Sequence, residues 1–183
     1  MAVRKASQLV QSFIGAPVLI DSADLGSTTH RVRLFWTNFI RPEQLEAALP
    51  TGIIPSPTLR EILNHNHTPT QVGHEDRFPF ARHNRMGQPR ICMPTLLSFL
   101  RSNAFRTKQN SKPGEKEVYN NITRVWEEPE VEEKEALMGY ARGVTSTSNV
   151  TENQRSIRIG RALDGNTMRW LGAFMAAKQK ENP

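Results

Sequence analysis

The sequence has 183 residues, of which 37% are hydrophobic and 23% are charged, so the chain is long enough to bury the core of one domain or slightly more. We find no apolar stretch of transmembrane length and no secretory signal at the N-terminus, which argues against a membrane protein. The single cysteine excludes an intramolecular disulfide and is compatible with a reducing compartment.

The net charge of +6 is unevenly distributed. Residues 115–135 contain eight Glu and three basic residues, a net charge of −5, so the rest of the chain carries +11. A basic body with one acidic segment is compatible with a polyanionic partner such as DNA. A solvated, charged surface without such a partner is the alternative, because excess charge raises solubility whatever the partner.

In chain order, residues 2–14 have the spacing of an amphipathic helix, which Gly15 and Pro17 would end. Residues 18–20 form a short apolar strand. Residues 31–38, rich in β-formers, form a second strand after a polar connector, and the two strands could pair antiparallel.

The middle of the chain is less regular. A short helix is predicted over Pro42–Ala48, with proline in its first turn, and a second helix begins after Thr58 with a capping-box pattern. Residues 64–94 indicate loops with small strands, residues 94–107 favour a strand, and residues 108–116 indicate a loop or disorder.

The C-terminal third is predicted to be helical. One helix covers 130–137 and ends at Gly139, and a Ser/Thr-rich loop follows. Thr151 caps a last helical region, which Gly165 interrupts and which frays from Lys178 onward.

Two arginines stand at the start of the second predicted strand, in the segment His30-Arg31-Val32-Arg33-Leu34-Phe35-Trp36-Thr37-Asn38. Positions two apart share one face of a strand, so both guanidinium groups could point into one cleft. Taken alone, the pattern is better explained by a basic edge strand that prevents aggregation.

A second block runs from Pro94 to Lys108 and combines Arg, Asn and Lys, the side chains that read base edges and hold phosphates. A third block consists of Glu135-Ala136-Leu137-Met138-Gly139-Tyr140, followed by 153–162 with Gln154-Arg155 and Gly160-Arg161-Ala162. Each block alone is compatible with an ordinary surface loop or capped helix.

The three blocks in this order resemble the second half of the DNA (cytosine-5) methyltransferase domain, closest to the eukaryotic de novo type. The first resembles motif VIII, with Thr29 in place of its glutamine. The second resembles the target-recognition segment, and the third resembles motifs IX and X, with Ala141 in place of a proline. The resemblance extends from about Ala2 to Met175.

The resemblance implies an α/β fold: a partial Rossmann-like S-adenosylmethionine-dependent methyltransferase fold with an inserted, loop-rich target-recognition region. Residues 1–40 would belong to the catalytic domain, 41–128 to the recognition region, and 129–183 would close the catalytic domain. The resemblance also assigns roles. Arg31 and Arg33 would be catalytic, stabilising negative charge on the flipped cytosine. The DNA-binding residues would be Arg101, Ser102, Asn103, Arg106 and Lys108, and the cofactor-binding residues would be Gly160, Arg161 and Ala162, with Asp164 nearby.

The catalytic elements of the family's first half are not in this sequence. There is no glycine-rich cofactor loop, no Glu-Asn-Val acid motif and no Pro-Cys nucleophile, because Ile91 precedes the only cysteine, Cys92. We therefore expect the chain to be inactive alone, as a truncated, split or decayed enzyme. A non-catalytic DNA-binding or interaction module derived from the same family is the alternative.

The expected partners are double-stranded DNA and an N-terminal methyltransferase half or related subunit, with no membrane, in the nucleus of a eukaryote or the cytoplasm of another cell. His65, His67, His74 and His83 raise the weaker possibility of a small metal-binding protein. Zinc ligands usually come at tighter, paired spacings, so no metal site is predicted and polar surface is the simpler interpretation. The acidic run 127–135 is predicted to be a solvated helix face.

Overall fold

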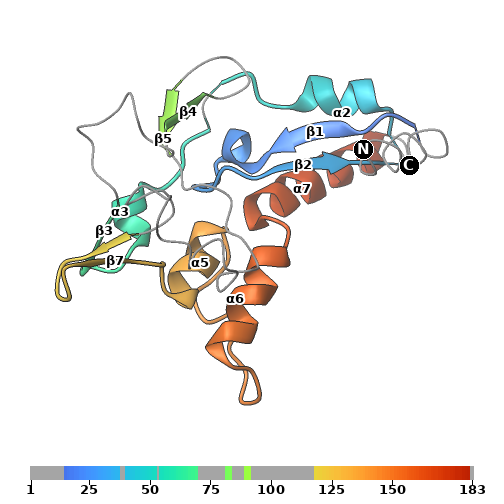
Figure 1. The fold of residues 1–183 in the computed structure, drawn as a ribbon. Coiled ribbons are helices and arrows are strands. Elements are labelled where there is room, and N and C mark those ends of the chain that lie inside the picture. The colour runs from blue at the N-terminus through green and yellow to red at the C-terminus, as the bar shows by residue number, and fades with distance from the viewer. Residues whose placement is uncertain are drawn as a thin grey trace, which may run out of the picture.

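The structure is a computed structural model that describes residues 15–37, 40–52, 54–69, 81–83, 89–91 and 118–181. The helix expected over 2–14 and the strand expected over 94–107 lie outside these residues. Over the described ranges the architecture is mixed α/β, with helices packed around small antiparallel sheets (Figure 1).

The first sheet is a two-stranded ribbon. Strands β1 (Val18–Asp21) and β2 (Val32–Phe35) pair antiparallel, as expected for the predicted strands 18–20 and 31–38, and Leu19 lies opposite Leu34. Between them the 3-10 helix η1 (Ser22–Leu25) ends at Gly26, which has a φ of 82°. The Asp21 carboxylate accepts hydrogen bonds from the backbone N–H groups of Ala23 and Arg31, so it fixes both ends of this connector.

Two helices flank the ribbon: α2 (Pro42–Ala48) and α7 (Gly165–Glu181) (Figure 1). Between them lies a cluster of buried aliphatic side chains, which we call the ribbon cluster. It consists of Val18, Ile20, Leu25, Leu45 and Leu49. Trp170 and Phe174 of α7 pack against it with their rings stacked, 5.5 Å between centroids. This cluster is an ordinary apolar core.

The other part of the molecule begins with α3 (Leu59–Ile62) and a three-stranded sheet in the order β3-β6-β7. These strands span His67–Pro69, Val118–Asn120 and Val125–Glu127. Pro69 pairs with Val118, so residues 70–117 leave and re-enter the sheet at neighbouring positions. Within that segment β4 (Ala81–His83) and β5 (Pro89–Ile91) pair antiparallel.

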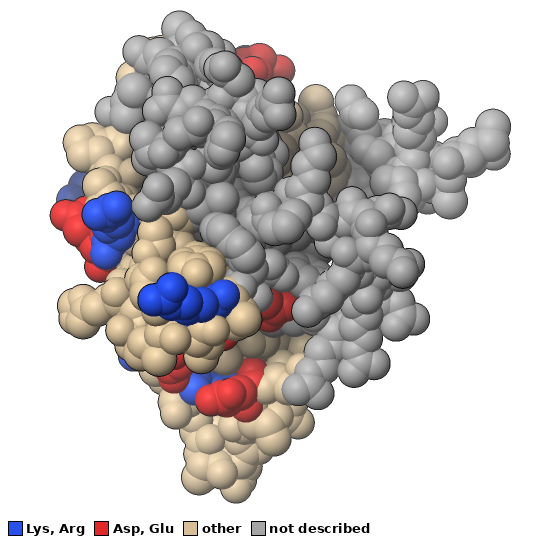
Figure 2. Space-filling model, turned by 60° about the vertical axis from the view of Figure 1, so that its left-hand side comes forward, with Lys and Arg blue, Asp and Glu red and all other residues tan. Residues whose placement is uncertain are grey.

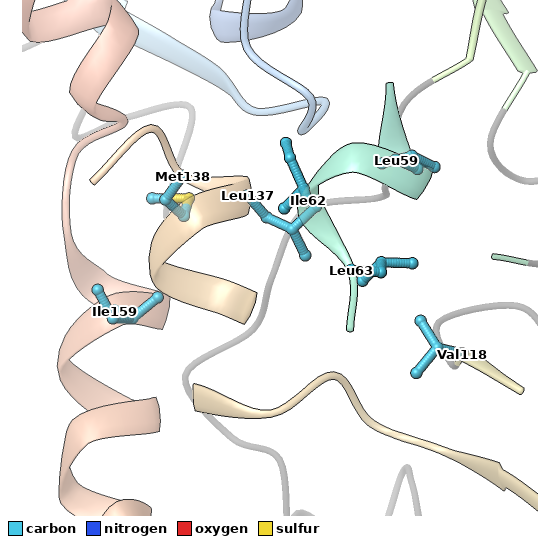
Figure 3. Close-up of a cluster of buried hydrophobic side chains, with 7 residues drawn as sticks. All are labelled: Leu59, Ile62, Leu63, Val118, Leu137, Met138 and Ile159. Carbon is cyan, nitrogen blue, oxygen red and sulfur yellow. The ribbon is translucent and has the colours of Figure 1, made fainter. Parts of the chain in front are cut away.

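Helices α5 (Val131–Leu137) and α6 (Glu152–Arg161) complete this part. Their apolar side chains meet those of α3 and β6 in a second cluster, which we call the helical cluster (Figure 3). It consists of Leu59, Ile62, Leu63, Val118, Leu137, Met138 and Ile159. The cluster therefore joins residues of the predicted recognition region 41–128 to residues of the segment 129–183.

Several local predictions are confirmed. The helix over Pro42–Ala48 has the predicted bounds, and Thr58 and Thr151 cap α3 and α6 through capping boxes. Gly139 follows α5 with a φ of 76°. The fraying predicted from Lys178 is wrong, because α7 continues to Glu181, and strands β6 and β7 were not predicted.

The Rossmann-like layer stays a prediction, as do the boundaries 1–40, 41–128 and 129–183. The strand pairs of the described residues are all antiparallel. Helix α2, from the predicted recognition region, packs on the ribbon, whereas α3 and β6 pack with α5.

Candidate functional site

The first and third sequence blocks meet at one buried position, which we call the joint: residues 27–31 against residues 160–164. Arg31, only 3% exposed, donates hydrogen bonds from Nη2 to the carbonyl oxygens of Gly160 (2.9 Å) and Ala162 (2.8 Å). These carbonyls lie at the C-terminal end of α6, where unpaired carbonyls and the helix dipole favour a cation. Burial lowers the pKa of Arg31, and Arg33 adds to this, yet a guanidinium remains charged.

The second half of the joint is a buried carboxylate, Asp164, which accepts hydrogen bonds from Ser27 Oγ (2.6 Å) and Thr29 Oγ1 (3.4 Å). Its other oxygen accepts from the backbone N–H groups of Asn166 and Thr167, at the beginning of α7. Burial raises the pKa of Asp164, and these hydrogen bonds partly oppose that shift. Asp164 thus fastens the start of α7 to the connector before β2.

The two arginines predicted to be catalytic do not share a face. Arg31 precedes β2, which begins at Val32, and turns into the joint, whereas Arg33 is exposed and donates from Nη1 to the Val32 carbonyl (2.7 Å). The alternation rule therefore does not apply to the pair, since only Arg33 belongs to the strand. Their catalytic roles stay predictions, and Arg33 is the one with its side chain at the surface.

The predicted cofactor residues Gly160 and Ala162 are part of the joint, and Arg161 is exposed. The carbonyls of Gly160 and Ala162 are already bound by Arg31, and the Tyr140 hydroxyl donates to the next carbonyl, that of Leu163. With these groups used internally, the described residues at the end of α6 do not by themselves form a cradle for S-adenosylmethionine. That assignment stays a prediction.

A buried ion pair connects the two parts of the third block. Glu135, fully buried, accepts hydrogen bonds from Arg155 Nη2 (3.1 Å) and from the backbone N–H of Thr145 (2.9 Å). The Thr145 hydroxyl and the Gly143 N–H also donate to it. Burial alone would raise the pKa of Glu135, but the bonds from Thr145, Arg155 and Gly143 lower it. The glutamate and arginine of the motif-like segments thus hold α5, the 141–150 loop and α6 together.

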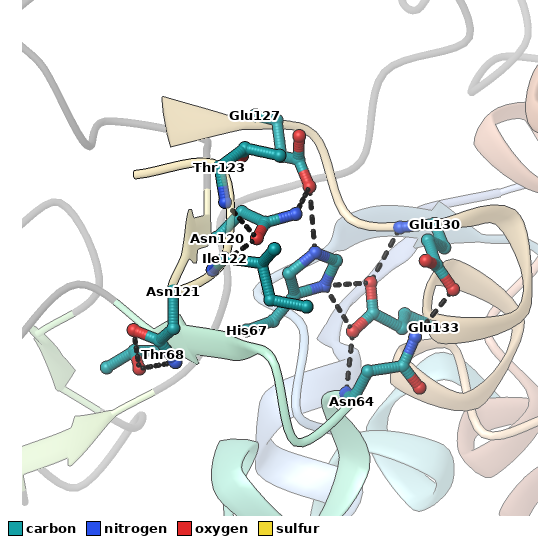
Figure 4. Close-up of polar contacts among 10 residues, drawn as sticks. All are labelled: Asn64, His67, Thr68, Asn120, Asn121, Ile122, Thr123, Glu127, Glu130 and Glu133. Carbon is teal, nitrogen blue, oxygen red and sulfur yellow. Dashed lines mark hydrogen bonds and ion pairs between the residues drawn. The ribbon is translucent and has the colours of Figure 1, made fainter. Parts of the chain in front are cut away.

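A second buried carboxylate, Glu133, lies on the opposite side of α5 next to His67 (Figure 4). His67 Nδ1 lies 2.7 and 2.8 Å from the two Glu133 oxygens, and His67 Nε2 lies 2.9 Å from a Glu127 oxygen. The backbone N–H groups of Asn64 and Glu130 also donate to Glu133. This cluster joins β3, β7 and α5.

The prediction that these carboxylates are exposed to solvent was wrong. The run 127–135 was predicted to be a solvated face, but Glu133 and Glu135 are 0% exposed and Lys134 is 4% exposed. Helix α5 has only seven residues and is surrounded by other segments. Donors for its charges come from positions distant in sequence, such as His67 and Arg155. The Ser/Thr-rich loop after Gly139 was the sequence feature that could have indicated hydrogen-bond donors for a buried Glu135.

A polar groove of about 690 Å³ lies between the start of α5 and the start of α6. Four glutamates line it: Glu128, Glu130, Glu132 and Glu152. Lys134 lies in its wall, where it binds Glu128 (3.0 Å), and burial lowers the pKa of this lysine. The negative lining is unsuited to phosphate.

The predicted DNA-binding residues Arg101, Ser102, Asn103, Arg106 and Lys108 lie outside the described residues, as does Cys92. On the described surface visible in Figure 2, basic side chains lie beside acidic ones. Within the described ranges no three His, Cys, Asp or Glu side chains are placed to hold a metal ion. The helices of those ranges are too short or too polar to cross a membrane.

No family model matches the chain, and no curated protein matches it. Among solved structures, the crystal structure of the S. pombe Dnmt2 methyltransferase is similar, with a TM-score of 0.48 and 13% identity. That similarity covers 96% of this chain and 61% of the other. The chain thus spans about three fifths of that structure, and a match at this level carries no functional argument.

Proposed function

We propose that this chain is the C-terminal portion of a DNA (cytosine-5) methyltransferase and that methyl transfer requires the N-terminal half of that domain. The supporting observation is the joint. The segments that resemble motif VIII and motif X are about 130 residues apart, and Arg31 contacts Gly160 and Ala162 directly. Two unrelated surface elements would have no reason to be joined by a buried, two-fold charge-assisted contact.

In the complete enzyme, S-adenosylmethionine would supply the methyl group, and the N-terminal half would supply the thiolate that attacks cytosine C6. The role of this chain is to bind and orient the flipped base. Negative charge builds on the cytosine O2 during the attack, and an exposed guanidinium can donate to that oxygen. Arg33 fits this task, whereas the Arg31 guanidinium is engaged within the protein.

The need for a partner is supported by the outer face of the ribbon. Leu19 and Leu34 lie opposite each other on β1 and β2 and are 62% and 43% exposed. A cross-strand pair of exposed leucines is the kind of apolar surface that another chain covers. We propose that an N-terminal methyltransferase half covers it. In a eukaryote the complex would act on DNA in the nucleus, and in another cell in the cytoplasm.

The test is methyl transfer to a DNA duplex by the 183-residue chain, with and without an N-terminal half from a related enzyme. We expect activity only with the added half. Under those conditions Arg33→Ala should lower the rate by on the order of 10²-fold, because one donor to the developing charge is lost. Arg60→Ala, at an exposed position of α3, is the matched control and should retain the rate.

Activity of the chain alone would contradict the proposal, since no nucleophile of the family pattern is present. No activity in either mixture, together with salt-dependent binding to duplex DNA, would favour the non-catalytic DNA-binding module instead.

A further inference from the structure

His67 is held between two carboxylates. Its side chain is 2% exposed, and its two ring nitrogens lie within 2.9 Å of oxygens of Glu133 and Glu127. An ionised carboxylate only accepts hydrogen bonds, so each ring nitrogen has to donate. A neutral imidazole has one N–H and would point a lone pair at one of the carboxylates. With both carboxylates ionised, this geometry requires the doubly protonated, positively charged ring.

His67 is the cationic side chain that contacts both Glu133 and Glu127 directly. From α5, Glu133 and the Glu130 N–H face the site, and from the segment before β3 the Asn64 N–H donates to Glu133. From β6, Asn120 donates to Glu127 (2.6 Å). Arg142 reaches only the Asn64 side-chain oxygen and the Ile62 carbonyl. Lys134 donates hydrogen bonds to Glu128 and Ser156, and its charge also acts on Glu133 without a hydrogen bond between them.

The cluster lies where two structural units meet. His67 and Glu127 belong to the sheet β3-β6-β7, whereas Glu133 belongs to α5. Figure 4 shows the imidazole between the β7 strand and the α5 helix, with its two nitrogens facing opposite sides. Deprotonation would leave Glu133, which is fully buried, without its cationic partner, and an unpaired buried charge is strongly unfavourable.

We propose that His67 is a pH-sensitive clamp: its charged ring holds the sheet β3-β6-β7 against α5, and loss of one proton loosens that contact. This inference does not depend on methyl transfer.

The direction of the pH effect follows from the contacts. Burial alone would lower the pKa of His67, but its hydrogen bonds to Glu133 and Glu127 raise it above the ordinary 6.5. A raised pKa in the folded state means that the stabilisation is complete below about pH 6.5 and is lost as pH rises through the folded-state value. The clamp should therefore be closed in mildly acidic solution and open in alkaline solution.

The first measurement is the ¹⁵N chemical shift of the His67 ring in the 183-residue chain as a function of pH. We expect two protonated nitrogens at pH 7. A neutral ring with a single N–H at that pH would overturn the proposal. Hydrogen exchange of the β6 amides should accelerate as pH rises to 9, beyond the intrinsic increase, while β1 and β2 amides serve as the internal reference.

Variants separate the clamp from ordinary packing. Glu127→Gln removes one of the two charges at a partly exposed position, so the pH at which stability is lost should shift downward. Glu43→Gln makes the same change on α2 and should cause no shift. His67→Gln should lower the Tm by several degrees at pH 6 and abolish the decrease of stability with rising pH above pH 6.5. His65→Gln, at an exposed position, should change neither the Tm nor this pH dependence. An unchanged slope in His67→Gln would refute the clamp.

Discussion

Around the β1–β2 ribbon the core consists of aliphatic and aromatic side chains, whereas around α5 it includes buried charges. The ribbon cluster contains Ile20 and Leu45, each 1% exposed, and is completed by the stacked rings of α7. Helix α5 buries Glu133 and Glu135 beside Leu137. An apolar core is tolerant of pH, because burial of hydrocarbon does not depend on protonation. A core with paired charges depends on every partner keeping its charge.

The largest effect should come from removing the buried glutamate that binds Arg155. Glu135→Ala leaves Arg155, Thr145 and Gly143 without their acceptor and should destabilise the protein by about 3–5 kcal/mol. The control is Glu132→Ala, which removes the other partner of Arg155 at a side chain 38% exposed and should cost about 0–1 kcal/mol. Urea unfolding at pH 7 measures both. Equal losses would show that burial does not distinguish the two pairs.

Glu135 also predicts how the stability of the protein changes at acidic pH. The pKa of Glu135 is lowered on folding, so its contribution is present above its unfolded value of about 4.5 and is lost as pH falls through the folded value. Wild-type stability should therefore decrease in acid more steeply than that of Glu135→Ala, as measured by unfolding between pH 6 and 3. Parallel plots of stability against pH for the wild type and Glu135→Ala would contradict the lowered pKa of Glu135.

The apolar half of the comparison is tested by Ile20→Ala. This change removes a buried side chain from the ribbon cluster and should cost about 2–4 kcal/mol, equally at pH 6 and pH 9. Leu19→Ala, one residue earlier with its side chain 62% exposed, should change the free energy of unfolding by about 0.5 kcal/mol or less. A marked pH dependence of the Ile20→Ala loss would remove the contrast with α5.

A smaller effect is expected at the joint. Arg31→Lys keeps the charge, but the lysine side chain is shorter and lacks the planar head whose Nη2 binds both carbonyls, so the loss should be about 1–3 kcal/mol. Arg33→Lys, at the exposed position two residues later, should stay within about 0.5 kcal/mol. Thermal unfolding of the two variants compares them directly, and a larger loss in Arg33→Lys would reverse the roles that the structure gives them.

The smallest change concerns a helix cap that the sequence already indicated. Thr58→Ala removes the side-chain acceptor for the Glu61 N–H and should cost about 1 kcal/mol. Ser56→Ala, two residues earlier in the exposed connector, is the control and should be neutral. If both were neutral, α3 would be held by Leu59 and Ile62 alone.

Local structure was predictable where neighbouring residues decide it. The strands Val18–Asp21 and Val32–Phe35 follow from their β-forming residues, and the helices after Arg41, Thr58 and Thr151 follow from proline or capping patterns. Strands β6 and β7 were not predictable in this way. Each has three residues. Strand β6 pairs with β3, some 50 residues away in the sequence, and β7 is a strand because it pairs with β6.

For the candidate site too, the sequence and the tertiary structure decided different features. The sequence alone determined which residue types could carry the function: two arginines near β2, a glutamate before Gly139 and Gln154-Arg155. Only the tertiary structure decided that Arg31 turns inward to Gly160, that Glu135 meets Arg155, and that His67 lies between two carboxylates. The physical reason is that a charged side chain can be buried only where partners compensate its lost hydration. Those partners are supplied by the fold from distant positions and not by the neighbouring residues.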